Sequence, residues 1–249
     1  MNHRRERIIA VLPAYNAAKT LERTVADIPR DWVDDIVVVD DASQDNTMEV
    51  ARKLGLHTVV HPKNRGYGGN QKTCYRLALE RRADIVVMVH PDHQYDPTAI
   101  PLLLAPILAD AADAVFGSRM MTPGAARAGG MPLWKYLANK ALTAVANRRL
   151  GLNLTEYHSG FRAYSRRVLA TIPLEENSDD FVFDTEIILQ LIARGFRISE
   201  VPITTRYFKD ASSIGLRRSV VYGLAILRCL WNYQGKSSVS LTKELQTPL

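Results

Sequence analysis

Two neighbouring carboxylates follow a β-branched run near the start of the chain. Asp40 and Asp41 come directly after the apolar residues 36–39, and Ser43 and Asp45 stand just beyond them. A carboxylate pair can accept hydrogen bonds from the N–H of a base or from ribose hydroxyls, whereas a short polar side chain before a helix suits its cap. The pair therefore predicts a nucleoside contact, with helix capping as the alternative. Asp45 is assigned to the cap.

A glycine-rich segment lies further along, at residues 63–72. Gly66, Gly68 and Gly69 stand between a short apolar run and a helical stretch. Glycines at such a turn let backbone N–H groups approach a phosphate, and the N-terminus of the helix favours negative charge. The spacing is neither that of a Walker loop nor that of a dinucleotide fingerprint. We predict a phosphate contact here, with an ordinary turn as the alternative.

A third polar segment, residues 90–97, follows another apolar run. Asp92 can offer oxygen ligands to Mg²⁺ or Mn²⁺, and such an ion can bridge the oxygens of a diphosphate. Gln94 can add a carbonyl oxygen or orient the other ligands. For His90 and His93, a structural or supporting role is favoured over direct ligation of the metal.

Apolar runs alternate with helical stretches through the first half of the chain. Strands are expected at residues 8–12, 36–39, 58–60, 85–89 and 114–116, and helices at residues 18–28, 47–54, 70–82 and 98–108. Buried apolar strands that alternate with helices predict an α/β fold with a mostly parallel sheet, covered by helices on both faces. Ligands bind at the carboxyl ends of such strands, so we expect the three polar segments to converge.

The second half of the chain is less regular. We expect a loop at residues 120–131, a helix at 133–150, a turn and short strand at 157–164, a helix at 184–194, a strand at 198–203 and a flexible loop near 209–215. No linker-like stretch divides the chain, which favours a single α/β domain at residues 1–215. An apolar helix at residues 216–234 and a polar tail at residues 235–249 follow it.

The composition limits the class of protein. The chain has 249 residues, of which 47% are hydrophobic, and a formal charge of +6. This charge suits nucleotides, phosphates or an acidic lipid surface, and its scatter without long basic runs argues against nucleic acid as a partner. Cys74 and Cys229 match no metal or redox spacing, which indicates a reducing compartment. No run reaches the ~20 apolar residues of a membrane span. We expect a cytoplasmic protein, with peripheral contact at the inner face of the membrane as an extension.

Short motifs occur in one characteristic order along the chain. They are Pro13-Ala14-Tyr15-Asn16, Val39-Asp40-Asp41 with Ser43, Asp45 and Thr47, Arg65-Gly66-Tyr67-Gly68, Asp92-x-Gln94, Phe116-Gly117-Ser118-Arg119, Ser159-Gly160-Phe161-Arg162, Phe183-Asp184-Thr185-Glu186 and Glu200-Val201-Pro202. In this order they resemble family-two glycosyltransferases of the GT-A fold, and most closely the dolichol-phosphate mannose synthases and polyprenyl-phosphate glycosyltransferases. The resemblance covers residues 7–215, so that residues 1–215 would form the GT-A, Rossmann-like domain.

The resemblance implies roles on the donor side. Contacts to a nucleotide sugar are implied for Pro13, Tyr15, Asn16, Asp40, Asp41, Gly66, Gly69, Lys72 and Asp92. The site of an Mg²⁺ or Mn²⁺ cofactor would be formed by Asp92, Gln94 and His90. The family motif usually begins with a carboxylate, where this chain has His90. Because imidazole is a softer and neutral ligand, we predict a weaker demand for Mg²⁺ and relatively better function with Mn²⁺.

Four arginines are implied on the phosphate-binding side. Arg119, Arg127 and Arg162 would contact the phosphates of the acceptor or donor, since the planar guanidinium meets phosphate in a bidentate manner. Arg206, ahead of the expected flexible loop, would close over the diphosphate. The chain departs from the family at residues 156–158, which read Glu-Tyr-His where Asp-x-Thr is usual.

The implied reaction is an inverting transfer from a nucleoside-diphosphate sugar, of GDP-mannose or UDP-glucose type, to a polyprenyl or dolichyl phosphate. A phosphate acceptor is already anionic near neutral pH and needs no strong base. In the alternative, the acceptor is a hydroxyl of a sugar, polyol or natural product, and Asp184 or Glu186 acts as its base. Asp184 could instead cap the helix that follows it. Catalytic roles are thus expected for Asp92, Asp184, Glu186 and Arg206. A non-catalytic nucleotide-sugar binder is the third hypothesis, suggested only by the altered metal motif.

The final helix carries an apolar stripe. Its members are Val220, Val221, Leu224, Leu227, Leu230 and Trp231, with Arg217, Arg218 and Lys236 at its flanks. One interpretation is a helix that lies on a membrane surface and brings the site to a lipid acceptor. The other is a helix that packs on the domain or on a second copy in a homodimer.

Overall fold

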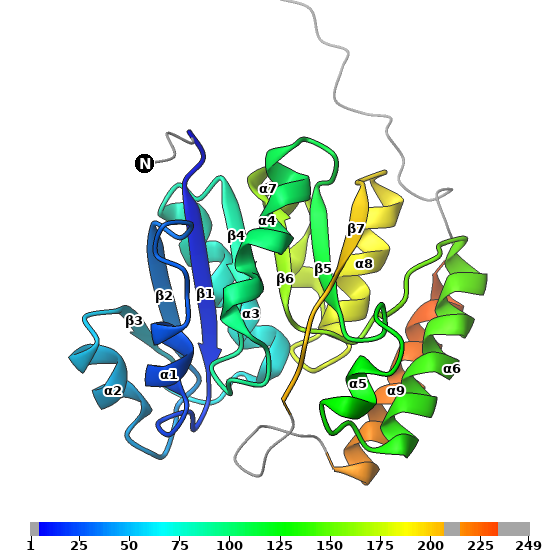
Figure 1. Ribbon diagram of the computed structural model, residues 1–249, viewed down its shortest axis with the longest axis horizontal. Helices are drawn as coiled ribbons and strands as arrows, with labels where there is room; N and C mark the ends of the chain where they lie inside the picture. Colours follow the sequence, from blue (N-terminus) through cyan, green and yellow to red (C-terminus); the bar gives the residue numbers. More distant parts are fainter. Residues whose placement is uncertain (1–4, 207–214, 234–249) are drawn as a thin grey trace, which may run out of the picture.

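One twisted sheet organises the computed structural model, which describes residues 5–206 and 215–233 (Figure 1). Its strands are β1 (Ile8–Ala14), β2 (Asp35–Asp40), β3 (His57–Val60), β4 (Ile85–Met88), β5 (Ala114–Ser118), β6 (Arg162–Ser165) and β7 (Ile198–Pro202). They pair in the order β3-β2-β1-β4-β6-β5-β7. β6 runs antiparallel to both of its neighbours, and the other pairs are parallel. The predicted single α/β domain with a mostly parallel sheet is confirmed.

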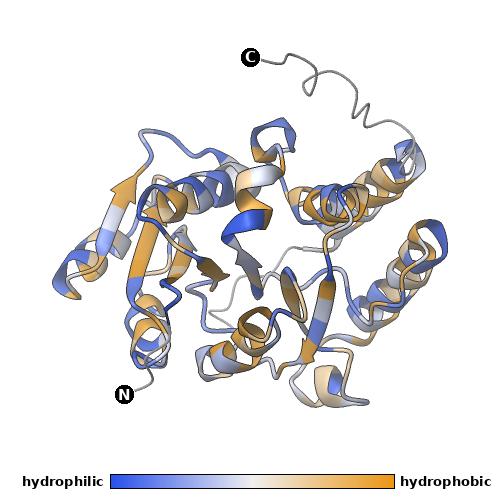
Figure 2. Cartoon of the chain, turned by 90° about the horizontal axis from the view of Figure 1, so that it is seen from above, coloured by the Kyte–Doolittle hydropathy of each residue, from blue (hydrophilic) through white to orange (hydrophobic). Residues whose placement is uncertain are grey.

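Helices cover both faces of this sheet (Figure 2). They are α1 (Leu21–Ala26), α2 (Thr47–Lys53), α3 (Gly66–Glu80), α4 (Ile100–Leu108), α5 (Ala125–Ala128), α6 (Leu133–Leu150), α7 (Arg166–Thr171), α8 (Phe183–Ala193) and α9 (Leu216–Asn232), with the short 3₁₀ turns η1 (Pro97–Ala99) and η2 (Leu174–Glu176). None of the helices in the described ranges has the length and apolar character needed to cross a bilayer.

The alternation of side chains along each strand divides the core into two clusters. In β1, Ile8, Ala10 and Leu12 are buried on the face covered by α1, α2 and α4. Ile9 and Val11 are buried on the opposite face, which is covered by α3, α7, α8 and parts of α6 and α9. Because successive residues of a strand point to opposite faces, an apolar run such as β1 must be covered on both sides.

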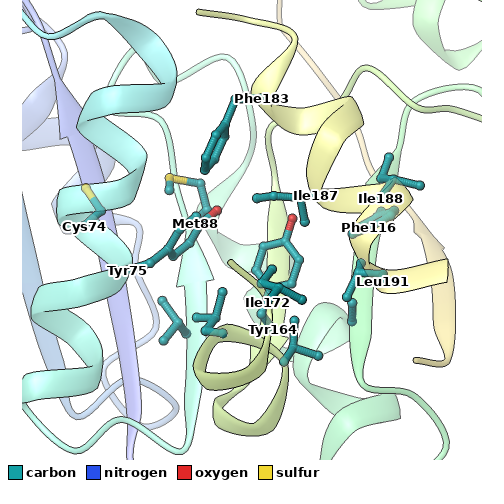
Figure 3. Packing of buried hydrophobic residues seen from close by; sticks show 14 of the residues in the cluster. Cys74, Tyr75, Met88, Phe116, Tyr164, Ile172, Phe183, Ile187, Ile188 and Leu191 are labelled. Carbon is teal, nitrogen blue, oxygen red and sulfur yellow. The ribbon is translucent and has the colours of Figure 1, made fainter. Parts of the chain in front are cut away.

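The second cluster is the larger and more aromatic of the two (Figure 3). Tyr75 of α3 meets Tyr164 of β6 edge to face, with ring centroids 5.6 Å apart. Phe183, at the start of α8, stacks on the other side of Tyr75 with centroids 6.4 Å apart. These rings fix the start of α8 relative to α3, and both helices begin beside the carboxyl ends of the strands.

The structure differs from the sequence expectation at several element ends. α3 begins at Gly66, four residues before the expected start, because the glycines form its first turn instead of preceding it. α1 begins only at Leu21, since residues 18–20 form a turn. The short helices α5 and α7 were not expected. The loop predicted near residues 209–215 and the tail at 235–249 lie outside the described residues, apart from Gly215.

α6 and α9 run side by side in the same direction at one end of the molecule (Figure 1). Gly223 of α9 lies opposite Leu142 of α6, where an added Cβ would be 3.8 Å from Leu142 Cδ1. About two turns further along both helices, Nε of Arg149 donates to the carbonyl oxygen of Leu230 at 3.1 Å. Since both contacts have the same offset along the sequence, the two helices are parallel, and their first turns lie at the same end.

A methyl group at Gly68 is expected to destabilise the protein. A Cβ there would lie 2.3 Å from the carbonyl oxygen of Ser178 and 2.9 Å from Cβ of Phe183. Gly68→Ala should lower the free energy of unfolding by ~1–3 kcal/mol, the usual cost of overpacking. Gly223→Ala is the matched control, because its surroundings leave room for a methyl group and alanine is the better helix former. Urea denaturation of both variants measures the difference; equal losses would contradict the close packing of α3.

Candidate active site

A cleft of about 990 Å³ lies where the parallel strands end. The loops after β1, β2 and β4 form one side, the start of α3 and the segment before α8 form the floor, and α9 forms the remaining wall. Its lining residues include Pro13, Tyr15, Asn16, Thr20, Asp41, Asn64, Gly66, Tyr67, Asn70, His90, Asp92, Ser178, Asp180, Phe181, Arg218, Val221, Tyr222 and Ala225. The structure thus brings together the three polar segments that the sequence predicted to converge.

Three residues around the cleft have left-handed backbone conformations. Asn16 follows β1 with φ of 51°, Ala42 follows β2 with φ of 61°, and His93 follows β4 with φ of 56°. Asparagine tolerates this region, whereas alanine and histidine adopt it at a cost. Local contacts hold these turns: Oδ1 of Asn16 accepts from the N–H of Gln44, and Nε2 of His93 lies 2.8 Å from Oδ2 of Asp27. His93 is therefore structural, and backbone strain gathers at the cleft, as it does at functional sites.

The carboxylate of Asp41 ties the end of β2 to the first turn of α3. Its Oδ1 accepts from the backbone N–H of Arg65 at 2.8 Å, and its Oδ2 accepts from that of Gly66 at 3.0 Å. Nδ1 of His61 lies 2.7 Å from the same Oδ1, and Nε2 of His61 lies 2.9 Å from Oγ1 of Thr73. Asp41 lines the cleft, but most of its hydrogen-bonding capacity is used to hold the cleft together.

Asp40 has a different environment from its neighbour. Its Oδ2 accepts from the backbone N–H of Ser43 at 3.0 Å, and it is buried and does not line the cleft. Oδ1 of Asp45 accepts from the backbone N–H of Thr47, the first residue of α2, at 3.0 Å. Asp45 thus satisfies a backbone N–H at the start of α2, as predicted, although the N-cap position itself is occupied by Asn46, whose side chain makes no capping bond. Of the carboxylate pair, only Asp41 reaches the cleft.

The N–H groups of the glycine-rich segment have acceptors within the protein. Gly66 donates to Asp41, as described above, and Gly68 donates to the carbonyl oxygen of Asp179 at 2.7 Å. Gly69 shares that carbonyl at 3.4 Å. This placement corrects the expectation that these backbone groups meet a phosphate, because their donors are occupied. The glycines are needed for another reason: added Cβ atoms at Gly66 and Gly68 would overlap residues 178–179.

His90 is packed between protein groups at the head of the predicted metal motif. Its ring stacks on Tyr67 with centroids 5.5 Å apart and planes 12° apart, and its Nε2 lies 3.3 Å from Oη of Tyr67. Gly160 closes the other side, where an added Cβ would lie 2.3 Å from Nε2. Burial lowers the pKa of His90 despite the nearby Asp92, so that the imidazole is neutral. Nε2 thus faces protein groups, whereas the ring as a whole lines the cleft, and a role of His90 as a metal ligand stays a prediction.

The two candidate bases lie outside the cleft lining. Oη of Tyr67 donates to Oδ2 of Asp184 at 2.8 Å, and Nη1 of Arg162 lies 3.6 Å from Oδ1 of this buried carboxylate. Burial and the charge of Asp184 raise the pKa of Tyr67 well above its usual value, so the phenol remains a donor. Oε2 of Glu186 accepts from the N–H of Ser178 at 2.7 Å. Asp184 does not cap α8 either, since it lies within its first turn.

Asp92 is the one acidic side chain of the predicted metal motif that lines the cleft. Its Oδ1 accepts from the backbone N–H of Gln94 at 3.0 Å. The side chain of Gln94 is buried and does not reach the lining. In the described part of the chain, no group of three or more histidine, cysteine or acidic side chains could enclose an ion. One carboxylate fits an ion such as Mg²⁺ that keeps several waters and takes its other ligands from substrate phosphates.

Two of the predicted phosphate-binding cations are turned into the fold. Arg162 is buried and donates to the carbonyl oxygens of Ser159 and Tyr157 at 2.7 and 2.8 Å. Nζ of Lys72 lies 2.8 Å from Oδ1 of Asp179 and is also buried. Both side chains hold the loops beneath the cleft in place. This corrects the expectations that Arg162 contacts a substrate phosphate and that Lys72 contacts the nucleotide sugar.

Arg119 pairs with Glu156, in the segment where the sequence departs from the pattern that it resembles. Glu156 accepts the backbone N–H of Arg119 at 2.8 Å and its guanidinium, and it accepts Nδ2 of Asn139 at 2.8 Å. Burial alone would raise the pKa of Glu156, but Arg119 lowers it below the ordinary value, so the pair is ionised. The Glu-Tyr-His segment therefore fixes Arg119 as a structural ion pair, which corrects its assignment to a phosphate.

The remaining predicted arginines lie outside the lining of the cleft. Arg127 is exposed, and its guanidinium donates to the carbonyl oxygen of Met131, three residues beyond α5. Arg206 is also exposed; its Nη2 lies 3.1 Å from Oδ2 of Asp96, and its backbone N–H donates to the carbonyl oxygen of Gln94. Arg206 is thus tethered to the loop that carries Asp92. Closure over a diphosphate stays a prediction.

Comparison with known proteins defines the family. The family model described as Glycosyl transferase family 2 matches residues 9–172, which run from β1 to the end of α7. The chain belongs to glycosyl transferase family 2. The matched region contains the loops that carry Tyr15, Asp41 and Asp92, whereas α8 and α9 lie beyond it.

Three relatives of this family 2 chain align with it over most of their own length. An uncharacterised protein of Methanocaldococcus jannaschii is 32% identical over 90% of each chain. The UDP-N-acetylglucosamine–dolichyl-phosphate N-acetylglucosaminyltransferase of Methanococcus voltae is 29% identical, over 92% of this chain and 97% of the relative. The undecaprenyl-phosphate mannosyltransferase of Micrococcus luteus is 32% identical, over 80% of this chain and 83% of the relative. Glucosyl-3-phosphoglycerate synthase of Mycobacterium tuberculosis shares the fold, with a TM-score of 0.72 at 24% identity over 91% and 79% of the two chains.

Several residues of this family 2 cleft were missed by the sequence analysis. They are Asn64, Tyr67, Asn70, Asp180, Phe181, Arg218 and Tyr222. Nδ2 of Asn70 donates to the carbonyl oxygen of Val39 at 3.1 Å, which ties α3 to β2. Asn64 and Tyr67 lie in the glycine-rich segment and could have been found there. Arg218 and Tyr222 gave no such signal, because only the tertiary fold brings α9 to the loops of the first half.

His90 and Gly160 are expected to be energetically coupled in this family 2 site. Gly160→Ala places a methyl group against the imidazole and should lower the free energy of unfolding by ~1–3 kcal/mol. His90→Asp shortens the side chain, so Gly160→Ala should cost much less in that background. Denaturation of the two single variants and the double variant should give a coupling of at least about 1 kcal/mol. Gly223→Ala combined with His90→Asp is the control and should be additive; additivity in both pairs would contradict the packing of His90.

Proposed function

We propose that this protein transfers a sugar from a nucleoside-diphosphate sugar to a polyprenyl phosphate. The observation that carries the proposal is one continuous cleft, in which Tyr15, Asp41 and Asp92 face a partly apolar wall of α9. Such a cleft offers one side to a nucleotide and the other to an amphiphilic acceptor. The relatives named above as dolichyl-phosphate and undecaprenyl-phosphate transferases support the same acceptor class.

The chemistry is a single displacement at the anomeric carbon. An oxygen of the acceptor phosphate forms the new bond, and the bond to the leaving diphosphate breaks with its electrons on the diphosphate oxygen. Tyr15, with 53% of its surface exposed at the cleft, offers an aromatic face to the base. Asp41 holds the walls of the nucleotide side together, and Asp92 would hold Mg²⁺ or Mn²⁺. When bound, the ion supplies charge stabilisation to the departing diphosphate.

The placement of the carboxylates favours a phosphate acceptor over a hydroxyl. A phosphate monoester has a second pKa of about 6 and is anionic without help. A hydroxyl needs a base within hydrogen-bonding reach. Asp184 is buried and Glu186 is engaged by Ser178, so neither is presented to the cleft. Asp180, which is exposed and lines the cleft, is the carboxylate that a hydroxyl acceptor would require.

An acceptor and donor screen tests the function. The full chain in detergent micelles, with Mn²⁺, is offered GDP-mannose, UDP-glucose or UDP-N-acetylglucosamine, and either farnesyl phosphate or farnesol. We expect nucleoside diphosphate and a sugar–phosphate–lipid product with farnesyl phosphate only, and Asp180→Asn should keep at least about half of that activity, because a phosphate nucleophile needs no base. If sugar is transferred to farnesol, and Asp180→Asn abolishes this transfer, the acceptor is a hydroxyl and Asp180 is its base. Tight nucleotide binding without transfer from any donor would show a non-catalytic binder.

Metal removal should abolish the transfer. Chelation should stop turnover, and Mn²⁺ should restore it better than Mg²⁺, because the neutral His90 replaces a carboxylate beside Asp92. Asp92→Asn should lower kcat by roughly 100-fold or more, the scale of losing a main electrostatic contact in a transition state. Asp92→Asn should also remove the increase in melting temperature that a nucleotide produces in the presence of Mn²⁺. Asp110→Asn, an exposed carboxylate in a left-handed turn before β5, is the control. Full activity after chelation would contradict the proposal that the transfer depends on a metal ion.

We infer that the N-terminal halves of α6 and α9 contact a membrane surface. Leu133 and Leu137 of α6 are 55% and 57% exposed, and Val220 and Leu224 of α9 are 56% and 62% exposed. Because the two helices are parallel and begin at the same end, these side chains lie toward the end of the helix pair where Arg218 and Val221 of α9 line the cleft. A polyprenyl phosphate resides in a bilayer, so an apolar rim at that end would bring the site to its acceptor.

Charges in this rim should weaken membrane binding. Leu133→Glu with Leu137→Glu should reduce co-sedimentation with liposomes that contain anionic lipid by at least about 10-fold, because both apolar burial and attraction to anionic lipid are lost. Leu102→Glu, a 51% exposed leucine of α4, is the matched control and should leave binding unchanged. Unaltered liposome binding, together with a shift from dimer to monomer in the α6 variant, would assign the rim to a homodimer.

A further inference from the structure

We propose that Arg218 binds the phosphate of the acceptor and that the adjacent apolar face of α9 takes the first isoprene units of its chain. This inference rests on the proposed function and assigns the acceptor subsite within it. Arg218 lies in the first turn of α9, outside the region that the family model matches. It is exposed and lines the same cleft as Asp92.

The charge balance of the cleft singles out this residue. Within the described lining, Asp41, Asp92 and Asp180 are acidic, and Arg218 is the one lysine or arginine. Two anionic substrates must nevertheless meet there. A cation bound by Asp92 can neutralise the charge of the donor diphosphate, and the acceptor phosphate then requires a second positive group. Arg218 is the described side chain that can supply it.

The other candidates for this task are engaged elsewhere. Lys72, Arg119 and Arg162 are held by acids or carbonyl groups within the fold, and the glycine N–H groups have protein acceptors. No acid of the described residues lies within ion-pair distance of Arg218, and the positive end of the α9 dipole adds to its field. A guanidinium in this position can meet a phosphate in a bidentate manner.

The position of Arg218 is fixed by the packing of α9 one turn further on. Oη of Tyr222 lies 3.3 Å from Nδ1 of His158, and its ring meets Phe181 edge to face at 6.1 Å. Ile226 and Leu230 are buried in the core on the same helix. These contacts hold the face that carries Arg218, Val221 and Ala225 toward the cleft, because positions three, four and seven residues apart share one side of a helix.

An apolar track leads away from Arg218 along α9. Val221 belongs both to the cleft lining and to the exposed surface, at 60% exposure. Leu224, which also belongs to the proposed membrane contact, continues it at 62% exposure. Val221 and Leu224 lie about 4.5 Å apart along the helix axis, at 1.5 Å per residue. A phosphate at Arg218 would therefore have an apolar surface for the chain attached to it.

The sheet order places this subsite opposite the nucleoside. Tyr15 and Asp41 follow β1 and β2, toward the β3 edge of the sheet. α9 packs on α6 and α8, which cover the half of the sheet that holds β5 and β7. Asp92 follows β4 and lies between the two groups. An acceptor at Arg218 and a donor at Tyr15 would thus approach the same point from opposite sides.

The test separates acceptor recognition from donor recognition. Transfer to farnesyl phosphate in micelles is measured for the wild type, Arg218→Ala, Arg218→Lys and the control Arg228→Ala, an exposed arginine of α9 outside the cleft lining. Arg218→Ala should raise KM for farnesyl phosphate by at least about 10-fold, the loss of a charge-assisted hydrogen bond. KM for the donor should change less than about twofold, since the donor is bound on the opposite side, and Arg218→Lys should recover part of the loss. A rise in the donor KM instead would assign Arg218 to the diphosphate and overturn the proposal.

A binding measurement keeps the outcome independent of turnover. Farnesyl phosphate, isopentenyl phosphate and farnesol are titrated calorimetrically into the wild type and Arg218→Ala. The wild type should bind farnesyl phosphate more tightly than either farnesol or isopentenyl phosphate. Arg218→Ala should bind farnesyl phosphate and farnesol with similar affinity, because the phosphate contact is lost. It should still bind farnesyl phosphate somewhat more tightly than isopentenyl phosphate, because the apolar contacts remain. Equal phosphate preference in both proteins would overturn the assignment of Arg218. If the wild type shows this preference but transfers sugar only to alcohols, the proposed function fails while the subsite stands.

Discussion

The carboxylate of Asp41 joins the two halves of the nucleotide side. It receives the backbone N–H groups of Arg65 and Gly66 and faces His61, which reaches on to Thr73 in α3. The end of β2 and the first turn of α3 are therefore one unit. A buried carboxylate is tolerable only when hydrogen bonds satisfy it, and here the satisfying donors are those that shape the wall of the cleft. Loss of this contact would separate the loops that every other site residue depends on.

The distribution of charge follows from the same constraint. Cations beneath the cleft are paired with Asp179, Glu156 and Asp184, because unpaired charges in a buried environment would be costly. These pairs stiffen the loops around the cleft and leave little positive charge within it. The proposed cation at Asp92 and the side chain of Arg218 are then the groups that would bind the anionic substrates. A basic chain can thus enclose a cleft whose own lining is acidic.

Most of the fold could be predicted from the sequence, because apolar runs such as residues 8–12 and 85–89 have few alternatives to buried strands. The convergence of Tyr15, Asp41 and Asp92 was predictable for the same reason, since parallel strands place the residues that follow them at one edge. Side-chain partners were not predictable. Arg162 lies in a short motif and is buried against carbonyl groups, whereas Arg218 lies outside every motif and faces the cleft. Only the packing of α8 and α9, set by contacts far apart in sequence, decides between these environments.

The reversed direction of β6 has a consequence for how the site can diversify. Parallel neighbours contribute the residues that follow them to the active edge, whereas a reversed strand contributes the residues that precede it. Residues 151–161 thereby come to the edge of the sheet that carries the cleft, and Gly160 packs against His90, which lines the cleft. Insertions or substitutions in that connection would displace His90, while changes after β6 would fall at the opposite edge of the sheet, away from the cleft. One inverted strand thus opens an extra segment of the chain to selection for new acceptors.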